Sequence, residues 1–372
     1  MARLGDVCEI LDSKRIPITA SDRIPGPYPY YGANGIQDYV ADYIFDDELI
    51  LLAEDGGNFG SKDKPIAYRV SGKCWVNNHA HVLKPRVGYD IDYICYSLMY
   101  YDVTNLVNGA TRQKLTQADM REMVIPERPL EEQKHIATLL GKLNDLISLR
   151  KQQIAKLDEL VKARFVEMFG DMLLNPLSWN EKPLESMADI VSGITKGRKT
   201  QSTELIEVPY MAVSNVKDGY IDWTTVKMIM ATKSEIHQYR ILPNDVLMTE
   251  GGDPDKLGRG AIIWEPIENC IHQNHMFRVR LDRNTVLPEF FAEYLQHQKA
   301  KRYFLGCAKQ TTGIASINMK QLRALPVLVP PIDSQEVFAD FAGRVERQKL
   351  TIQQSLDKLE VLKKSLIQEY FE

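Results

Sequence analysis

The sequence has few of the features that mark specialised classes of protein. None of its apolar runs approaches the roughly 18 uncharged residues that a membrane-spanning helix requires. The first residues carry no basic segment followed by an apolar one, so they do not read as a secretory signal. The five cysteines are odd in number, far apart and never in a CxxC pair, which fits thiols in a reducing compartment. We therefore expect a cytoplasmic protein that makes no contact with a membrane.

Positive charge is not in excess either. The formal net charge is −4 at pH 7, so the chain as a whole does not attract a polyanion, and binding to nucleic acid would depend on local basic patches. The balance of 44% hydrophobic and 26% charged residues is that of an ordinary globular protein. A length of 372 residues exceeds one ordinary core and indicates two or three domains.

Motifs for catalysis are absent or incomplete. The sequence has no GxxxxGK[ST] phosphate loop, and residues 57–62 resemble one only superficially. Residues 175–178 lack the second proline and the aromatic residue of an adenine N6-methyltransferase motif. Acid-x-Lys tripeptides of the kind that nucleases use, such as residues 12–14 and 132–134, arise by chance in a chain this charged. We expect no catalytic residues here and chemistry supplied by partner proteins.

Two groups of cysteine and histidine raise the question of a metal site. Their members are Cys74, His79 and His81 in the first group, and Cys270, His272 and His275 in the second. Neither group has the paired spacing of structural zinc ligands or an evident fourth ligand, so we expect no bound metal. Both contain an Asn-His pair, which indicates a turn or the packed end of a strand; a loop that faces DNA is the alternative.

The chain contains an internal repeat. Residues 120–169 align with residues 322–371 without a gap, at a constant offset of 202 residues. Residues 129–133 read PLEEQ where residues 331–335 read PIDSQ, and the two segments close on Phe169 and Phe371. We infer that they are two helices of one origin.

Each repeated segment has the start signals and the apolar spacing of one long helix. Prolines precede it, and acidic residues in its first turn complement the helix dipole. Side chains then recur at alternating spacings of four and three residues, the pattern of a coiled-coil seam. The seam residues are Ile136, Leu140, Leu143, Ile147, Ile154, Leu157, Phe338, Val345, Ile352, Leu356 and Leu359. Each helix would be about 60 Å long, so we expect the two to pack on each other; helices that merely support a core are the alternative.

The segments that precede the helices match more faintly. Residues 49–52 are an apolar run that leads into EDGGN, and residues 245–248 lead into TEGGD. Glycine, asparagine and aspartate separate such runs, which is the pattern of short strands joined by turns. Helices are expected near residues 91–101 and 288–304. We predict an α+β fold in which a globular domain and a long helix occur twice, as a pseudo-twofold internal repeat.

This order of elements resembles that of the specificity (S) subunit of type I restriction-modification enzymes. The resemblance covers nearly the whole chain, and its most specific motifs are GATRQKL at residues 109–115, the helix entry at residues 125–133 and LDELVK at residues 157–162. It implies two target-recognition domains on an antiparallel coiled coil, in a non-catalytic chain that scaffolds two methyltransferase subunits and, in the full complex, two restriction subunits. S-adenosylmethionine, ATP and Mg would be used by those partners, and no cofactor would be bound by this chain.

The resemblance divides the chain into four parts. Residues 1–108 and 176–310 would be the two target-recognition domains, and residues 109–175 and 311–372 would be the repeated regions with the long helices. Residues 311–317 read TTGIASI and lack the basic residues of GATRQKL, so a basic contact there does not carry over to the second copy. Two different readers held apart by a helical spacer would contact two different half-sites, so we predict an asymmetric, bipartite double-stranded DNA target.

Candidate DNA contacts are polar or basic residues on loops, because such side chains read base edges and hold phosphates. In the first half they are Lys14, Arg15, Asn34, Asn58, Lys62, Lys64, Thr111, Arg112 and Lys114. In the second half they are Lys196, Arg198, Lys199, Asn215, Lys256, Arg259, Lys309, Thr311 and Thr312. Their occurrence in corresponding places favours them over isolated surface charges. The alternative functions are a stand-alone coiled-coil scaffold and a methyltransferase or nuclease fragment with a cryptic active site.

Overall fold

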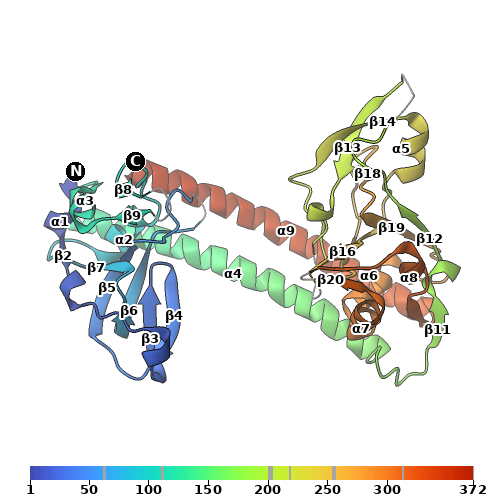
Figure 1. Cartoon of the computed structure of the whole chain (residues 1–372), viewed down its shortest axis with the longest axis horizontal. Coiled ribbons are helices and arrows are strands. Elements are labelled where there is room, and N and C mark those ends of the chain that lie inside the picture. The colour runs from blue at the N-terminus through green and yellow to red at the C-terminus, as the bar shows by residue number, and fades with distance from the viewer. Residues whose placement is uncertain are drawn as a thin grey trace. The chain divides into compact units, whose positions relative to one another are not determined.

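Two helices of 40 residues each, α4 (Leu130–Phe169) and α9 (Ile332–Phe371), are the longest elements of the chain (Figure 1). The computed structural model describes residues 1–61, 64–109, 113–199, 204–217, 219–253, 257–311 and 314–371. The two helices begin and end 202 positions apart, which is the offset of the ungapped alignment. Among the helices of this described part, none is long and apolar enough to cross a membrane.

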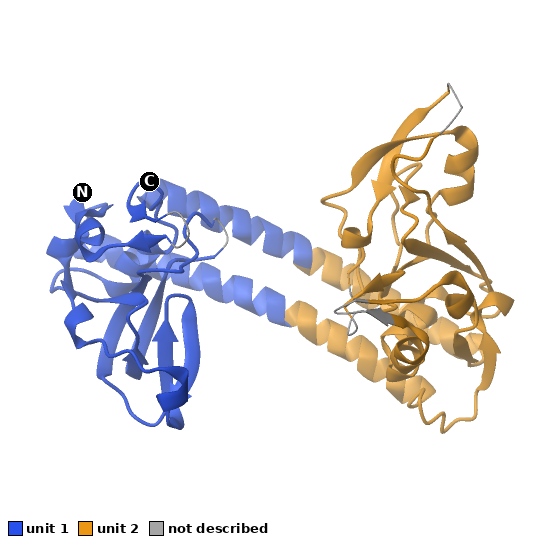
Figure 2. Ribbon diagram, in the orientation of Figure 1, with its two compact units in different colours: residues 1–152, 353–372 blue, residues 153–352 orange. Residues whose placement is uncertain are grey.

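The chain forms two compact units, and each takes one segment of both long helices (Figure 2). Unit 1 consists of residues 1–152 and 353–372, and unit 2 consists of residues 153–352. Both units mix helices and sheets, as the predicted α+β class requires. The four-part division of the chain into recognition domains and repeated regions remains a prediction.

Unit 1 is built on a six-stranded sheet of order β2-β7-β5-β6-β3-β4, antiparallel except for the β3–β6 pair. Its central strand β5 (Phe45–Ala53) contains the apolar run of residues 49–52, which is fully buried because both faces of the sheet are covered. Ile50 and Leu52 face one core, and Leu49 and Leu51 face another. The elements of its globular part are β1 (Ala2–Arg3), α1 (Leu4–Val7), β2 (Cys8–Ile10), η1 (Asp12–Lys14), η2 (Ala20–Asp22), β3 (Pro25–Gly32), β4 (Gly35–Val40), β5 (Phe45–Ala53), β6 (Ala67–Val76), β7 (Ala80–Pro85), α2 (Ile91–Met99), β8 (Val107–Asn108), β9 (Lys114–Leu115), α3 (Gln117–Glu122) and β10 (Val124–Ile125).

Within unit 1 the start of α4 and the end of α9 join the same core. Ile136 and Leu140 of α4 are buried there together with helix α2, which confirms the helix predicted near residues 91–101. Leu366 and Tyr370 of α9 pack against this core, and the Phe371 ring lies 5.2 Å from that of Tyr93. The two helix segments therefore lie together in this unit, the start of one with the end of the other.

Unit 2 divides its strands among smaller sheets. The order β12-β19-β15-β17 forms one sheet and β14-β13-β18 forms another. In unit 1 the single strand β6 pairs with both β5 and β3, whereas in unit 2 β17 pairs with β15 and β18 pairs with β13. The strands β17 and β18 together therefore occupy the place of β6. The elements are β11 (Asn180–Pro183), η3 (Leu184–Ser186), β12 (Ala188–Ser192), β13 (Ile206–Met211), η4 (Val213–Asn215), β14 (Lys227–Ala231), α5 (Lys233–Tyr239), β15 (Val246–Thr249), β16 (Gly251–Gly252), β17 (Gly260–Ile262), β18 (Ile271–His272), β19 (Met276–Leu281), α6 (Pro288–Gln296), α7 (Gln298–Cys307), β20 (Lys309–Thr311), β21 (Ile314–Ser316), α8 (Met319–Arg323) and β22 (Pro326–Val329).

The helix predicted near residues 288–304 is two helices. His297 has an extended backbone, with φ −77° and ψ 152°, and its side chain accepts a hydrogen bond from the backbone N–H of Lys299. It therefore ends α6 and caps α7, which a periodic apolar pattern alone does not reveal. The core of unit 2 gathers rings from three helices, since Phe165 and Phe169 of α4 pack on Phe290 of α6 and on Phe338 of α9 at centroid distances of 4.9 to 5.7 Å.

Candidate nucleic-acid interface

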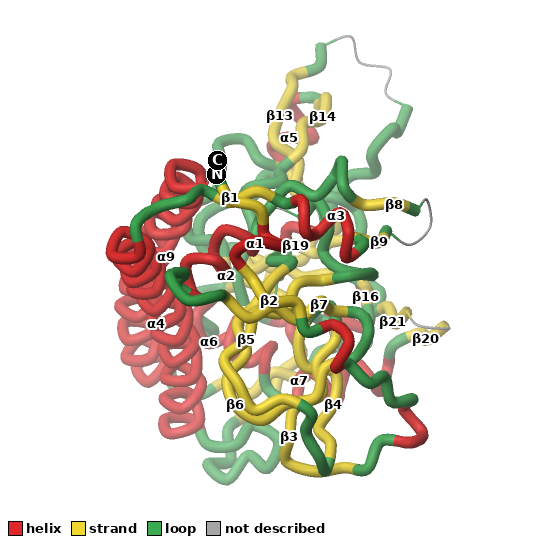
Figure 3. The backbone as a smooth tube through the Cα atoms, turned by 90° about the vertical axis from the view of Figure 1, so that its left-hand side faces the viewer, coloured by secondary structure: helices red, strands yellow, loops and turns green. Residues whose placement is uncertain are grey.

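A β-hairpin stands at a corresponding place in each unit. In unit 1 it is formed by β8 and β9, and Figure 3 shows it on the side of that unit opposite to α4 and α9. In unit 2 it is formed by β20 and β21. Strand β9 contains the last two residues of the GATRQKL segment, and β21 lies in the counterpart of that segment; both segments were predicted from the sequence to contact DNA.

The same backbone hydrogen bonds attach both hairpins to their units. The Leu115 N–H donates to the Glu54 carbonyl at 2.8 Å, and the Ile317 N–H donates to the Glu250 carbonyl at 2.9 Å. The Glu54 and Glu250 N–H groups in turn donate to the carbonyls of His79 and His275, at 2.9 and 3.0 Å. Here the duplicated Asn-His pair lies in a turn beside the hairpin, and each histidine pairs with an acidic side chain.

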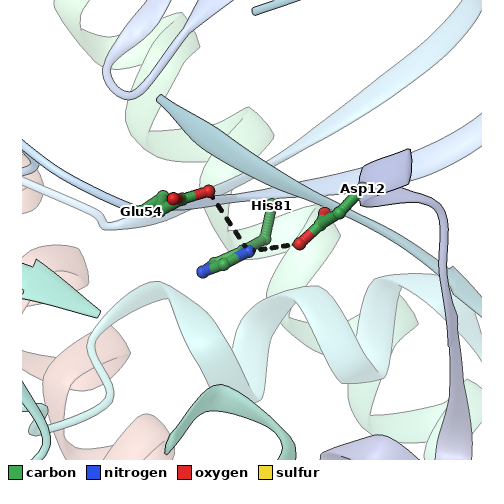
Figure 4. A group of neighbouring side chains, drawn as sticks. All are labelled: Asp12, Glu54 and His81. Atoms are coloured by element: carbon green, nitrogen blue, oxygen red, sulfur yellow. Dashed lines mark hydrogen bonds and ion pairs between the residues drawn. The ribbon is translucent and has the colours of Figure 1, made fainter. Parts of the chain in front are cut away.

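In unit 1 a group of charged side chains, most of them buried, connects the hairpin to the rest of the unit. We call Asp12, Arg15, Glu54, His81 and Lys114 the ionic cluster. His81 is 1% exposed, and its Nδ1 lies 2.7 Å from Asp12 Oδ2 and 3.6 Å from Glu54 Oε2 (Figure 4). Its Nε2 lies 3.0 Å from the Leu115 carbonyl oxygen on β9. The imidazole thus joins η1 and β5 to the hairpin.

Two cations complete the ionic cluster. Arg15 lies 2.6 Å from Glu54 Oε2 and 3.4 Å from Asp12 Oδ2, and it also donates to the Ala80 carbonyl. The Lys114 ammonium lies 2.9 Å from Glu54 Oε1, and the Lys114 side chain is 52% exposed. The positive charges of these side chains therefore compensate the two buried carboxylates.

Burial and hydrogen bonding compete at both carboxylates. Burial acts to raise the pKa of Asp12, but the hydrogen bond and charge of His81, the backbone N–H of Val82 and the charge of Arg15 hold that pKa below its usual value. Burial likewise acts to raise the pKa of Glu54, and its hydrogen bonds with Arg15 and Lys114 hold the pKa below its usual value. Both carboxyl groups are therefore ionised at neutral pH.

Asp12, Glu54 and His81 are also the group of described residues whose ligand atoms lie close enough together to consider a metal ion. Two zinc ligands at about 2.1 Å in a tetrahedral arrangement are about 3.4 Å apart. The His81 and Asp12 atoms are 2.7 Å apart, the spacing of a direct hydrogen bond. Since Arg15 and Lys114 already bind the carboxylates, the arrangement fits an ion-pair network and not a metal centre.

Among the other predicted contacts of unit 1, Lys14 and Lys64 are exposed. Asn34 is exposed and donates to the Gly56 carbonyl at 3.0 Å, while the half-buried Asn58 donates to the Pro65 carbonyl at 3.3 Å. Arg15 differs from the expected basic loop residue, since its side chain is 13% exposed and its guanidinium is bound within the ionic cluster.

In unit 2, Lys196, Lys199 and Lys309 are exposed. Arg198 is instead bound by both oxygens of Glu235, at 2.6 Å on the Nε side, and this pairing lowers the pKa of Glu235 to about 2. Arg259 is half-buried.

The expectation that Asn215 contacts DNA is wrong for this conformation. Its side chain is 0% exposed, accepts from the Ala212 N–H at 2.9 Å and donates to the Asp222 carbonyl and Thr225 hydroxyl, so that it closes a turn within the fold.

Several predicted contacts lie outside the described residues: Lys62, Thr111, Arg112, Lys256 and Thr312. Thr311 lies on β20, and its side chain also lies outside the described part. The predicted seam residues are all placed, and each is buried or half-buried on α4 or α9.

Comparisons with known proteins agree on one kind of relative. A sequence model of the type I restriction modification DNA specificity domain matches residues 1–159 and 176–361. A putative type I restriction enzyme specificity subunit of Haemophilus influenzae is 25% identical over 361 residues, which cover 95% of this chain and 89% of that protein. The type I restriction enzyme EcoKI specificity subunit of Escherichia coli is 23% identical over 316 residues, which cover 81% of this chain and 67% of that protein.

Solved structures include a similar fold. The crystal structure of the type I restriction-modification system S subunit from M. genitalium superimposes with a TM-score of 0.63 at 15% identity, covering 100% of this chain and 95% of that one.

Proposed function

Since the chain belongs to the type I restriction-modification DNA specificity family, we propose that its two globular parts read the two halves of an asymmetric DNA target. Within such a complex it is the DNA specificity subunit and not the catalytic one, because methylation and cleavage reside in partner subunits. S-adenosylmethionine, ATP and Mg are accordingly proposed as cofactors of the partners, and the complex is proposed to act in the cytoplasm, where its DNA substrate lies.

One observation carries the proposal of two readers. The hairpins of units 1 and 2 are attached by equivalent backbone hydrogen bonds, yet their side chains differ. The position of Lys114 on β9 corresponds to Ser316 on β21 at the repeat offset. Equivalent attachment supports equivalent use, and different side chains support different half-sites.

We also propose that α4 and α9 form the antiparallel coiled coil that separates the readers. Within unit 1, Lys151 of α4 pairs with Glu360 of α9 at 2.8 Å. Within unit 2, Lys349 of α9 pairs with Asp158 of α4 at 2.7 Å. Flanking ion pairs beside a buried seam are typical of coiled coils.

The repeat further supports two methyltransferase subunits. Leu160 and Leu362 are 202 positions apart, and each is 48% exposed on its helix. Leu160 and Phe341 line a surface hollow of about 500 Å³ in unit 2. The residue 202 positions before Phe341 is Leu139, so both copies offer apolar residues at the same positions. Equivalent apolar patches favour two copies of one partner.

Methylated-base mapping tests this function. Cells that express the methyltransferase subunits should gain methylation at one bipartite, asymmetric sequence when this chain is added, and should show none without it. Methylation that is independent of the chain, or that has no sequence preference, would exclude the DNA-reading role and favour a scaffold.

A further inference from the structure

We propose that the ionic cluster positions Lys114 and strand β9 for contact with the DNA backbone, and so acts as a specificity-positioning unit for one half-site. This inference rests on the proposed function and deepens it, because it names which buried residues act through which exposed one. It concerns the described residues of β8 and β9, and residues 110–112 lie outside the described part of the chain.

Lys114 is the member of the cluster that a ligand can reach. Its side chain is 52% exposed, while that of its partner Glu54 is 11% exposed. A lysine ammonium has three donors, and Glu54 engages one of them at 2.9 Å. The group can therefore bind a phosphate oxygen without leaving Glu54, and Glu54 fixes the direction in which the ammonium points.

His81 fixes the strand that carries Lys114. The Leu115 carbonyl can only accept, so His81 Nε2 must carry a hydrogen. Asp12 Oδ2 accepts from Gln117 Nε2 at 3.0 Å and also lies 2.7 Å from His81 Nδ1. The buried ring of His81 thus connects Asp12 on one side with β9 on the other.

Two bonds therefore hold Leu115, which is 0% exposed. The His81 ring donates to the Leu115 carbonyl, and the Leu115 N–H donates to the Glu54 carbonyl at 2.8 Å. Removing one member of a buried ion network leaves the other charges uncompensated, so the remaining members rearrange. Because Lys114 is adjacent to Leu115 and bound to Glu54, such a rearrangement displaces its ammonium.

The second copy lacks this unit. The offset that aligns His79 with His275 places Phe277 at the position of His81, and Phe277 is a core residue that is 3% exposed. Ser316 stands where the first copy has Lys114. The cluster can therefore affect only the half-site that unit 1 reads, which gives its test a one-sided signature.

The test uses the complete complex with its methyltransferase subunits and measures affinity for DNA in which either half-site is scrambled. The variants are His81→Gln, Lys114→Gln and their combination. We expect each single variant to weaken binding about tenfold, within the range that phosphate and charge-assisted contacts give. The combination should weaken it no further, because His81 acts through Lys114. Discrimination at the other half-site should be unchanged.

Lys309→Gln is the matched control, since Lys309 is an exposed lysine on the hairpin of unit 2. The loss of DNA affinity caused by Lys309→Gln should add in full to the loss caused by His81→Gln. If the complex with His81→Gln does not assemble, Gln117→Ala replaces it; this exposed residue donates to Asp12, and its loss should weaken the same half-site to a smaller extent.

Additive effects of His81→Gln and Lys114→Gln, or equal losses at both half-sites, would overturn the inference. A wild-type complex without any sequence preference would instead overturn the proposed function, so that the two failures are distinguishable.

Discussion

The side chains of Gln133 and Gln335 make the same hydrogen bonds in the first turns of the two long helices. Gln133 accepts from the Asp90 N–H at 2.9 Å and donates to the Arg128 carbonyl at 2.8 Å. Gln335 accepts from the Leu287 N–H at 2.9 Å and donates to the Pro330 carbonyl at 2.8 Å. Asp90 and Leu287 are the N-caps of α2 and α6. Each glutamine therefore connects the start of a long helix to the start of a short one, α2 in unit 1 and α6 in unit 2.

Replacing either glutamine by leucine should destabilise its own unit. Both side chains are at most 1% exposed, so leucine would leave buried backbone groups without partners, at about 1–3 kcal/mol each. Hydrogen exchange in each unit measures the effect. Gln152→Leu is the control, because this glutamine of α4 is exposed and should tolerate the change. A similar loss in the control would show that the buried bonds contribute nothing special.

A buried histidine should make unit 2 sensitive to acid. Burial, aided by the charge of Arg278, lowers the pKa of His272 to about 3, and neither ring nitrogen has a hydrogen-bond partner among the described residues. The unfolded chain takes up a proton below its ordinary pKa of 6.5 and the folded chain does not, so stability falls as pH decreases from about 6.5 toward 3. Between pH 7 and pH 5 the loss is about 2 kcal/mol.

His272→Val should remove this acid sensitivity. Val76 is the corresponding residue of unit 1, since β6 pairs Val76 with β3 as β18 pairs His272 with β13. Thermal unfolding between pH 7 and pH 5 checks the prediction, with the exposed His237→Gln as the control. An unchanged pH dependence in His272→Val would place its origin elsewhere.

Substitutions of Arg198 and of its neighbours Lys196 and Lys199 should affect different properties, stability in the first case and DNA binding in the second. Arg198 is 20% exposed and bound to Glu235, so Arg198→Gln should lower stability. The folded pKa of Glu235, about 2, lies below the ordinary value of 4.5, so this pair stabilises above pH 4.5 and its contribution is lost as pH falls toward 2. Lys196→Gln and Lys199→Gln should leave stability unchanged and weaken DNA binding, with a salt slope reduced by about one each.

Calorimetry and DNA titration at several salt concentrations separate the two kinds of residue. If Arg198→Gln kept full stability and reduced the salt slope as the lysine variants do, its guanidinium would contact phosphate in the complex and not Glu235.

Charged substitutions on the exposed helix faces should reduce the number of bound methyltransferase subunits. Leu160→Asp and Leu362→Asp each place a charge on one of the two apolar patches, so each should leave one subunit bound, and the double variant should leave none. Native mass spectrometry counts the subunits. Leu174→Asp is the control, because Leu174 is 76% exposed but follows the end of α4. Two subunits retained by the double variant would move the docking surface elsewhere.

The parts of the fold that depend on local sequence were predictable. Both long helices and the offset of 202 residues between them were predicted, because prolines, acidic first turns and the seam spacing are contained in the segments themselves. The ionic cluster was not found, because Asp12, Glu54 and His81 are distant in sequence and only the pairing of β7 with both β5 and β2 brings them together. The sequence instead grouped His81 with Cys74 and His79, its neighbours along the chain.

Candidate DNA contacts were separable only in part, for a chemical reason. Arginine and asparagine are suited to bases and phosphates through the same donors that bind carboxylates and backbone carbonyls inside a fold. Asn215 and Arg198 satisfy internal partners, whereas Lys196 and Lys309 remain exposed. Such a difference depends on tertiary contacts that spacing alone does not contain.

An exchange of one globular part tests the account most directly. Residues 182–308 would be replaced by the corresponding segment of another specificity subunit, and methylated bases would be mapped in cells that supply the methyltransferase subunits. Two independent readers should give a hybrid target, in which one half-site changes to that of the donor while the other half-site stays as it was. A target changed or lost in both halves would contradict two independent readers on one helical frame.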